Sequence, residues 1–349
     1  MLSKNPDKMT PKERMRAFSK GEPMDRIPIV PDMGVTMAWY IGARTYDYYH
    51  DPKVLAQTEI ELFKRFFHDS VSVSTTLRGM AEAMGSKIAY TPNGLSQLEE
   101  ALVKKPEDIK NLKPINPHKD GLLHVLMEAL EIIREAIGDV ADIGASMTAP
   151  FSVAASILGA ENLLKWTRRE PEALKDLMEI ITLNNKSYII ALSEKGFSTS
   201  FCCPVSSTTL ISKKQFQEFS LPYLSKNIDD VHELCGSKPT LHICGKSKDL
   251  WLDCVDAGIG NFSIDNIEDL TEAKEMIGDR CIITGNVPPV EVMYLGTEED
   301  VFKSVKTCID KAINSPCGYI LSTGCQIPMN TKIENIDAFM EAGREYGKL

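Results

Sequence analysis

Two residues with clear chemical potential stand two positions apart in this chain of 349 residues: His242 and Cys244, in the stretch LHICGKSKD. Side chains two apart on a β-strand project to the same side, so an imidazole and a thiol at this spacing can bind one metal ion. A third ligand is available from Cys325, in the stretch STGCQIP. The alternative interpretation is a buried strand that packs a histidine and a cysteine and binds nothing.

One imidazole and two thiolates are typical zinc ligands, and catalytic zinc sites keep three protein ligands with an exchangeable fourth position. Zinc holds a bound thiol as thiolate at neutral pH, or makes a hydroxide from water. The other cysteines call for a different interpretation. Cys202 and Cys203 are neighbours on a predicted strand, where they would face opposite ways, so we expect core packing rather than metal binding.

The elements that must position these residues alternate in type along the chain. Short β-rich runs are separated by longer stretches in which apolar residues recur every three or four positions. We predict strands at residues 26–32, 69–75, 141–147, 198–206, 239–245, 261–266, 281–287 and 318–325. Such alternation is typical of parallel βαβ units. Eight units that close on themselves predict one TIM (β/α)8 barrel over residues 1–349, with an open doubly wound sheet as the alternative.

Residues 76–120 fit this repeat least well. They contain Pro92-Asn93-Gly94, a turn signal, followed by a polar connection. We therefore predict a small hairpin insertion after the second strand, near the mouth of the barrel.

Functional groups of a (β/α)8 barrel lie at the carboxyl ends of its strands. His242 and Cys244 end the predicted fifth strand and Cys325 the eighth, with a glycine beside each cysteine to relieve crowding near an ion. Asp265 follows the sixth strand. It is a candidate catalytic residue that would act as a fourth ligand or as a hydrogen-bond partner of His242; the alternative is a surface acid.

Three further features lie at strand ends. Asp32 ends the first strand and is a candidate catalytic carboxylate or a helix cap beside Gly34. Asn286, in the stretch GNVPP, is a structural turn residue or a contact to cofactor or substrate. Residues 36–50 gather one tryptophan and four tyrosines, which either cover the barrel or line a wall for an aromatic ligand.

Composition sets limits on the function. The chain is 43% apolar and 25% charged, with a formal net charge of −10, which argues against non-specific nucleic-acid binding. It has no run near the roughly 18 apolar residues of a membrane span. The first residues are polar, without the apolar core of a signal peptide. We expect a cytoplasmic protein with reduced cysteines.

From about residue 10 onward, several stretches resemble the uroporphyrinogen decarboxylase superfamily. They are GEPMDRIPI, which enters the first strand, APFSVAASILGAENLLKW, ITGNVPPVEVM, and the closing helix TKIENIDAFMEAGREYG. The resemblance covers nearly the whole chain and implies a TIM barrel.

Three departures separate this chain from the true decarboxylases. The family's early R-Q-A-G-R motif is missing from VPDMGVTMAWYIGART, and Cys325 stands where a decarboxylase keeps a histidine. The decarboxylases also lack the His-x-Cys pair and use no metal. The pattern instead resembles the cobamide-dependent methyltransferases of the superfamily, whose zinc ligands would correspond to His242, Cys244 and Cys325.

This resemblance implies a zinc-dependent transfer of a methyl group to or from a corrinoid that a separate small protein carries. The other substrate would be a thiol such as coenzyme M, or a methoxylated compound. Two alternatives remain: a decarboxylase that acts on a tetrapyrrole, and a non-enzymatic module that docks a corrinoid protein.

Overall fold

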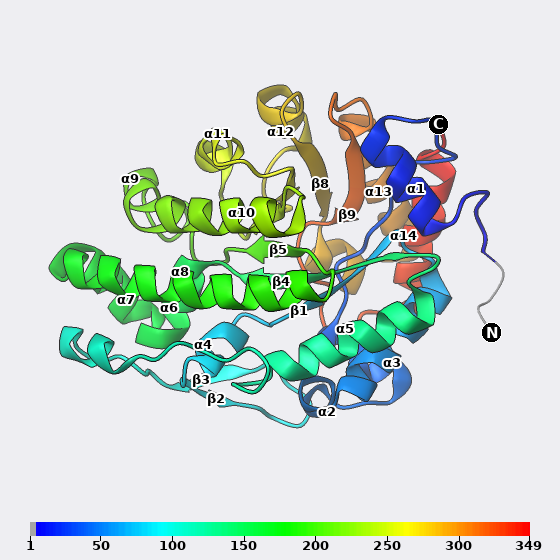
Figure 1. The fold of residues 1–349 in the computed structure, drawn as a ribbon. Helices are drawn as coiled ribbons and strands as arrows, with labels where there is room; N and C mark the ends of the chain where they lie inside the picture. The colour runs from blue at the N-terminus through cyan, green and yellow to red at the C-terminus, as the bar shows by residue number, and fades with distance from the viewer. Residues whose placement is uncertain (1–4) are drawn as a thin grey trace. The chain divides into compact units, whose positions relative to one another are not determined.

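Parallel strands and helices alternate along the chain (Figure 1). The structure, a computed structural model, describes residues 5–349. Within these residues seven strands follow the order β1-β4-β5-β6-β7-β8-β9. β4, β5 and β6 pair in parallel, and so do β7, β8 and β9. The strands are β1 (Ser70–Ser74), β4 (Asp142–Thr148), β5 (Thr199–Cys202), β6 (Thr240–Ile243), β7 (Asn261–Ile264), β8 (Ile282–Val287) and β9 (Tyr319–Thr323). Seven of the eight predicted strands are therefore confirmed.

The chain divides into two compact units. The first comprises residues up to 72, 129–144 and 261–349. Its helices are α1 (Pro11–Lys20), η1 (Val35–Ile41), α2 (Thr45–His50), α3 (Pro52–Phe66), α12 (Leu270–Ile277), η5 (Pro289–Tyr294), α13 (Glu298–Ala312) and α14 (Ile333–Tyr346), together with part of α5 (Leu123–Ile137). α13 and α14 pack side by side, and each buries one face in which apolar residues recur at helical spacing.

The second unit comprises residues 73–128 and 145–260. Its helices are α4 (Gly79–Ala83), η2 (Pro106–Asn111), α6 (Pro150–Leu158), α7 (Ala160–Arg169), α8 (Pro171–Glu194), α9 (Lys213–Gln215), η3 (Phe216–Ser220), α10 (Leu221–Cys235), η4 (Lys248–Leu250) and α11 (Trp251–Asp256). α8 and α10 run side by side (Figure 1, green). α10 ends at a glycine stop, Gly236, whose φ of 67° lies in the left-handed region.

The predicted first strand, residues 26–32, does not form a regular strand. Ile29 makes a single parallel bridge to Leu321 of β9, with Val30 N–H donating to Leu321 O at 2.8 Å and Leu321 N–H to Pro28 O at 2.9 Å. Pro28 and Pro31 have no N–H to donate, so the ladder cannot continue. The segment nevertheless lies beside β9, and Ile29 O accepts from Asp69 N–H, directly before β1.

A buried ionic cluster anchors α1 and the start of this segment in the first unit. Arg14, fully buried, binds Asp25 through Nε at 2.7 Å and also pairs with Asp69. Arg26 pairs with Asp69 at 2.6 Å and with Asp7 at 2.7 Å. Each buried charge thus has an opposite partner, which offsets the cost of removing it from water.

The predicted turn at residues 92–94 lies between two short antiparallel strands, β2 (Lys87–Ala89) and β3 (Gln97–Glu100). Its role as an insertion near a barrel mouth stays a prediction. Among the described residues no helix is both long and apolar enough to span a bilayer.

Candidate metal centre

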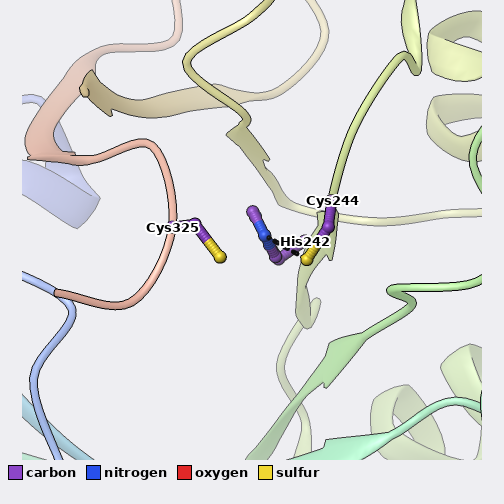
Figure 2. Close-up of side chains that lie close together, drawn as sticks. All are labelled: His242, Cys244 and Cys325. Carbon is purple, nitrogen blue, oxygen red and sulfur yellow. Dashed lines mark hydrogen bonds between the residues drawn. The ribbon is translucent and has the colours of Figure 1, made fainter. Parts of the chain in front are cut away.

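His242 and Cys244 lie together in the second unit, at the carboxyl end of β6. Burial alternates along this strand: Leu241 and Ile243 are fully buried on one side, while His242 is half-buried on the other. His242 Nε2 lies 3.1 Å from Cys244 Sγ (Figure 2). The strand ends at Ile243, one residue before the predicted cysteine, but both side chains still face one side. The spacing argument for this pair therefore holds.

Gly245 fixes the turn that carries Cys244, for a reason that differs from our prediction. Its φ is 85°, and a Cβ at this position would lie 2.9 Å from Thr209 Oγ1 and 3.0 Å from Ser207 Oγ. The glycine therefore makes room for two hydroxyl side chains. Thr209 Oγ1 also accepts from Lys246 N–H at 3.1 Å, and Lys246 O accepts from Thr208 N–H at 2.8 Å.

The hydroxyl residues after β5 thus hold the turn after β6. Sequence reasoning did not single them out, although the stretch SSTT follows directly on a predicted strand. A run of hydroxyl residues is common in loops, so the stretch alone did not distinguish this contact from an ordinary surface turn.

Cys203 packs in the core, as predicted. It is fully buried, and its N–H donates to His242 O at 2.8 Å. Burial, together with the neighbouring Cys254 and Cys244, raises the pKa of the Cys203 thiol well above its usual value. This thiol stays protonated, which makes it a poor nucleophile and a poor metal ligand.

Cys325 lies in the first unit, two residues after the end of β9, on the loop drawn in Figure 2. It is half-buried. Gly324 N–H donates to Val287 O at 2.9 Å, and a Cβ on Gly324 would lie 2.4 Å from Asn266 N. Only glycine fits there, so the residue before Cys325 is held tightly against the end of β8 and the loop after β7.

Asp265 and Asn286 form a second set of contacts in the first unit. Asp265 is buried, which contradicts its interpretation as a surface acid, and its Oδ1 accepts from Ile267 N–H at 3.0 Å. Asn286 Nδ2 donates to Asp265 O at 3.1 Å and to Glu268 O at 2.8 Å. Both amide hydrogens of Asn286 are thus used to hold the loop after β7, which favours its interpretation as a structural residue.

Asp32 is exposed and does not cap η1, because the N-cap position is Gly34 and no side chain bonds there. Its main chain has a different role. Asp32 N–H donates to Thr323 Oγ1 at 3.2 Å, and Asp32 O accepts from Ile327 N–H at 2.8 Å. Residues on both sides of Cys325 are therefore bound to Asp32.

A buried carboxyl group that sequence reasoning missed, Glu59 of α3, lies in the same unit. Its Oε1 accepts from the Tyr48 hydroxyl at 2.6 Å, and both side chains are almost fully buried. The pKa of Glu59 is raised to about 7, mainly by burial and to a lesser extent by the charge of Asp32, against the lowering effect of the Tyr48 hydrogen bond. The only sequence signal was an acid among the apolar positions of a helix.

The aromatic residues of 36–50 divide between the core and the surface. Tyr48 and Tyr49 are buried, whereas Trp39 and Tyr46 are about two-fifths exposed, at 37% and 40%. This segment therefore packs on α3 through part of its aromatic set and presents the rest to solvent.

Comparisons with known proteins found a family and several relatives that match most of this chain. The uroporphyrinogen decarboxylase (URO-D) family matches residues 10–346. The methylcobamide:CoM methyltransferase MtaA of Methanosarcina barkeri is 27% identical over 346 residues, which cover 97% of this chain and 98% of the relative. MtbA of Methanosarcina acetivorans, also a methylcobamide:CoM methyltransferase, is 28% identical over 97% of this chain and 98% of its own length.

Plant decarboxylases match less of the chain. Uroporphyrinogen decarboxylase 2 of rice is 29% identical over 62% of this chain and 56% of its own length. Among solved structures, a methyltransferase from Methanosarcina mazei superposes with a TM-score of 0.86, at 26% identity, over 97% of this chain and 99% of that one. From the match over residues 10–346, the chain belongs to the uroporphyrinogen decarboxylase family.

Proposed function

We propose that this protein is a cobamide-dependent methyltransferase. It would transfer a methyl group from a corrinoid, carried by a small partner protein, to a thiol such as coenzyme M. The observation that carries the proposal is the His242–Cys244 pair, whose Nε2 and Sγ atoms lie 3.1 Å apart. Relatives that match nearly the whole chain are named methylcobamide:CoM methyltransferases, which favours a thiol over a methoxylated compound.

We further propose that His242, Cys244 and Cys325 bind one zinc ion. Together they offer an imidazole nitrogen and two sulfurs, a donor set that could hold a metal ion. This set fits zinc in a catalytic site, where three protein ligands leave one position for substrate. Zinc bound there would lower the pKa of a substrate thiol, so that the sulfur is presented as thiolate.

The other residues of the site would act by position and charge. The turn at Gly245 holds Cys244, and the bonds to Asp32 hold the loop of Cys325. Asp265 would either complete the ligand set or accept a hydrogen bond from His242, which would fix the imidazole tautomer. Asp32, exposed at the carboxyl end of residues 26–32, would accept the proton that the substrate thiol loses.

The fold that would bring these groups together is a closed (β/α)8 barrel, with residues 26–32 in the place of its first strand, beside β9. This proposal is supported by the bridge from Ile29 to Leu321 on one side and the bond from Asp69 N–H to Ile29 O on the other. The hairpin of β2 and β3 would then lie near the mouth of the barrel.

Metal analysis of the purified, reduced protein tests the proposal. We expect about one zinc ion per chain in the wild type and a large loss in His242→Ala and Cys325→Ala. Cys317→Ala is the matched control, because Cys317 is an exposed cysteine of the same unit as Cys325. This variant should keep its zinc.

An activity assay then separates the reaction classes. The wild type should consume methylcobalamin in the presence of coenzyme M, and the two ligand variants should not. Absence of zinc from the wild type, or release of carbon dioxide from a carboxylated tetrapyrrole without methyl transfer, would instead support the decarboxylase alternative.

A further inference from the structure

A cavity of about 460 Å³ lies in the second unit, between the turn that follows α4 and the segment that follows β3 (Figure 1). This volume is within the range of sites for small organic ligands. All of its lining residues belong to residues 84–113, and none of them is a candidate zinc ligand. The cavity is therefore a separate feature, formed by the part of the chain that departs most from the βα repeat.

The wall that follows β3 is bound to two helices. Leu102 N–H and Val103 N–H both donate to Ile157 O in the last turn of α6, at 2.9 and 3.2 Å. Ile115 N–H donates to Asn184 Oδ1 of α8 at 2.8 Å. Because these bonds fix the wall, a ligand would bind with little loss of chain entropy.

One part of the lining is apolar. Met84 is buried, and Leu102 and Leu112 are half-buried. A Cβ on Gly85 would lie 3.8 Å from both Cδ atoms of Leu102, so the two methyl groups of Leu102 approach the opposite wall. Such a surface favours the apolar body of a ligand, because contact with it removes apolar area from water.

The rest of the lining is charged, with the lysines Lys87, Lys104 and Lys113 and the acids Glu100 and Asp108. Lys87 Nζ lies 3.1 Å from Glu100 Oε2, and Lys104 Nζ lies 2.5 Å from Glu100 Oε1. One carboxylate thus binds two ammonium groups. Asp108 Oδ2 accepts from two backbone N–H groups, at 3.0 and 3.1 Å. Both acids therefore have partners within the protein.

The charges of the lining do not cancel. Hydrogen bonds and charges from Lys104 and Lys87 lower the pKa of Glu100 to about 2, and the backbone N–H of Lys104 lowers the pKa of Asp108. Both acids are thus ionised near neutral pH. Three lysines against two carboxylates leave one excess positive charge, in a chain whose formal net charge is −10. The ammonium of Lys113 forms no ion pair with any residue in 5–349.

We propose that this cavity binds a small organic anion, an apolar body that carries one phosphate or carboxylate group. The anionic group lies against Lys113, whose charge no carboxylate of the protein offsets, and forms a charge-assisted hydrogen bond with it. The apolar body lies against Met84, Leu102 and Leu112. A cationic ligand is disfavoured because both carboxylates already have partners.

The test is isothermal titration calorimetry with phenyl phosphate, on full-length, reduced and metal-free protein at neutral pH and low ionic strength. Removal of metal excludes a zinc ion as a second place for phosphate. We expect saturable binding with a Kd of about 1 mM or lower. Phenol and inorganic phosphate each carry only half of the probe's chemistry and should bind about tenfold more weakly or less. Benzoate is titrated in parallel, and the tighter of the two anions identifies the group that the site prefers.

Two variants locate the binding. Lys113→Ala should weaken the binding of phenyl phosphate about tenfold, because it removes a hydrogen bond from a charged group. Lys110→Ala is the matched control, since Lys110 is an exposed lysine of η2 that does not line the cavity. Leu102→Ala should weaken phenyl phosphate about fivefold but leave inorganic phosphate unchanged, because it removes only apolar contact. If Leu102→Ala does not fold, the Lys113 variant decides the question alone.

Three results would overturn the proposal: no saturable binding of phenyl phosphate or benzoate by the wild type, wild-type affinity in Lys113→Ala, or phenol that binds as tightly as phenyl phosphate. The inference does not rest on the proposed function. Because the assay uses neither metal nor methyl donor, a failure of the zinc or methyltransferase proposal would not change its result.

Discussion

Substitution of Gly245 by alanine tests whether the hydroxyl residues after β5 position Cys244. Two costs add at this residue. An alanine with φ near 85° costs about 1–2 kcal/mol in backbone strain. Its Cβ would also lie 2.9 Å from Thr209 Oγ1 and 3.0 Å from Ser207 Oγ, and such crowding in a packed region typically costs about 1–3 kcal/mol. We expect the free energy of unfolding to fall by about 2–5 kcal/mol.

Gly236→Ala is the matched control for the backbone cost. Gly236 belongs to the same unit and has a φ of 67°, but a Cβ there would meet no atom within 4 Å. This variant should lose only about 1–2 kcal/mol. The difference between the two variants, measured by urea denaturation followed by circular dichroism, isolates the contact with Ser207 and Thr209.

The same pair of variants separates stability from metal binding. Because the turn at Gly245 carries Cys244, Gly245→Ala should weaken zinc binding about tenfold in a chelator competition, as substitutions next to metal ligands commonly do. Gly236→Ala should leave zinc binding unchanged. Equal losses of stability in the two variants, or wild-type zinc affinity in Gly245→Ala, would refute the positioning role of the hydroxyl residues.

Three further predictions concern the first unit. Arg14→Ala removes the arginine partner of Asp25 and leaves Asp69 with Arg26 alone, so the free energy of unfolding should fall by about 3–5 kcal/mol; a loss below about 1 kcal/mol in urea denaturation would contradict this. Burial lowers the pKa of His68 to about 3, and the unfolded chain takes up a proton below about pH 6.5, so stability should fall as pH drops from 6.5 towards 3. In His68→Phe the free energy of unfolding should depend less on pH over this range. If denaturation at several pH values shows the same pH dependence for the variant and the wild type, His68 is not the cause. Asn286→Asp replaces the amide group that donates to two carbonyl oxygens with a negatively charged carboxylate. The free energy of unfolding should fall by about 2–4 kcal/mol. An unchanged melting temperature would mean that these hydrogen bonds do not hold the loop after β7.

Much of the fold could be predicted because the strands are short apolar runs separated by helices of clear period. The exception is residues 26–32, where the apolar pattern is that of a strand but Pro28 and Pro31 interrupt the hydrogen-bond ladder. Residues 26–29 are all buried, while the backbone of the segment makes one bridge to β9. The pattern of apolar residues predicts which side chains are buried. It does not predict whether each backbone N–H forms a hydrogen bond with a neighbouring strand.

The candidate site was predicted only as far as local spacing allows. His242 and Cys244 are two residues apart, so strand geometry alone brings them together. Glu59 and Tyr48 are eleven residues apart on two helices, and their contact depends on how α2 and α3 pack. The same holds for Ser207 and Thr209 against Gly245. These contacts join loops and helices that are brought together by tertiary packing, which the spacing of residues along the sequence does not predict.

The ionic cluster at the start of the chain has a consequence for synthesis on the ribosome. Asp7 binds Arg26 near the start of the chain and Arg344 near its end, and the backbone of Arg26 forms an antiparallel β-bridge with that of Lys348. Asp7 can pair with Arg26 early, but Arg344 is synthesised more than 300 residues after Asp7, so the Asp7–Arg344 pair forms only once α14 has emerged. The second unit ends at residue 260 and can fold earlier. Nascent chains should therefore gain protease resistance first in residues 145–260 and only at the end around α1.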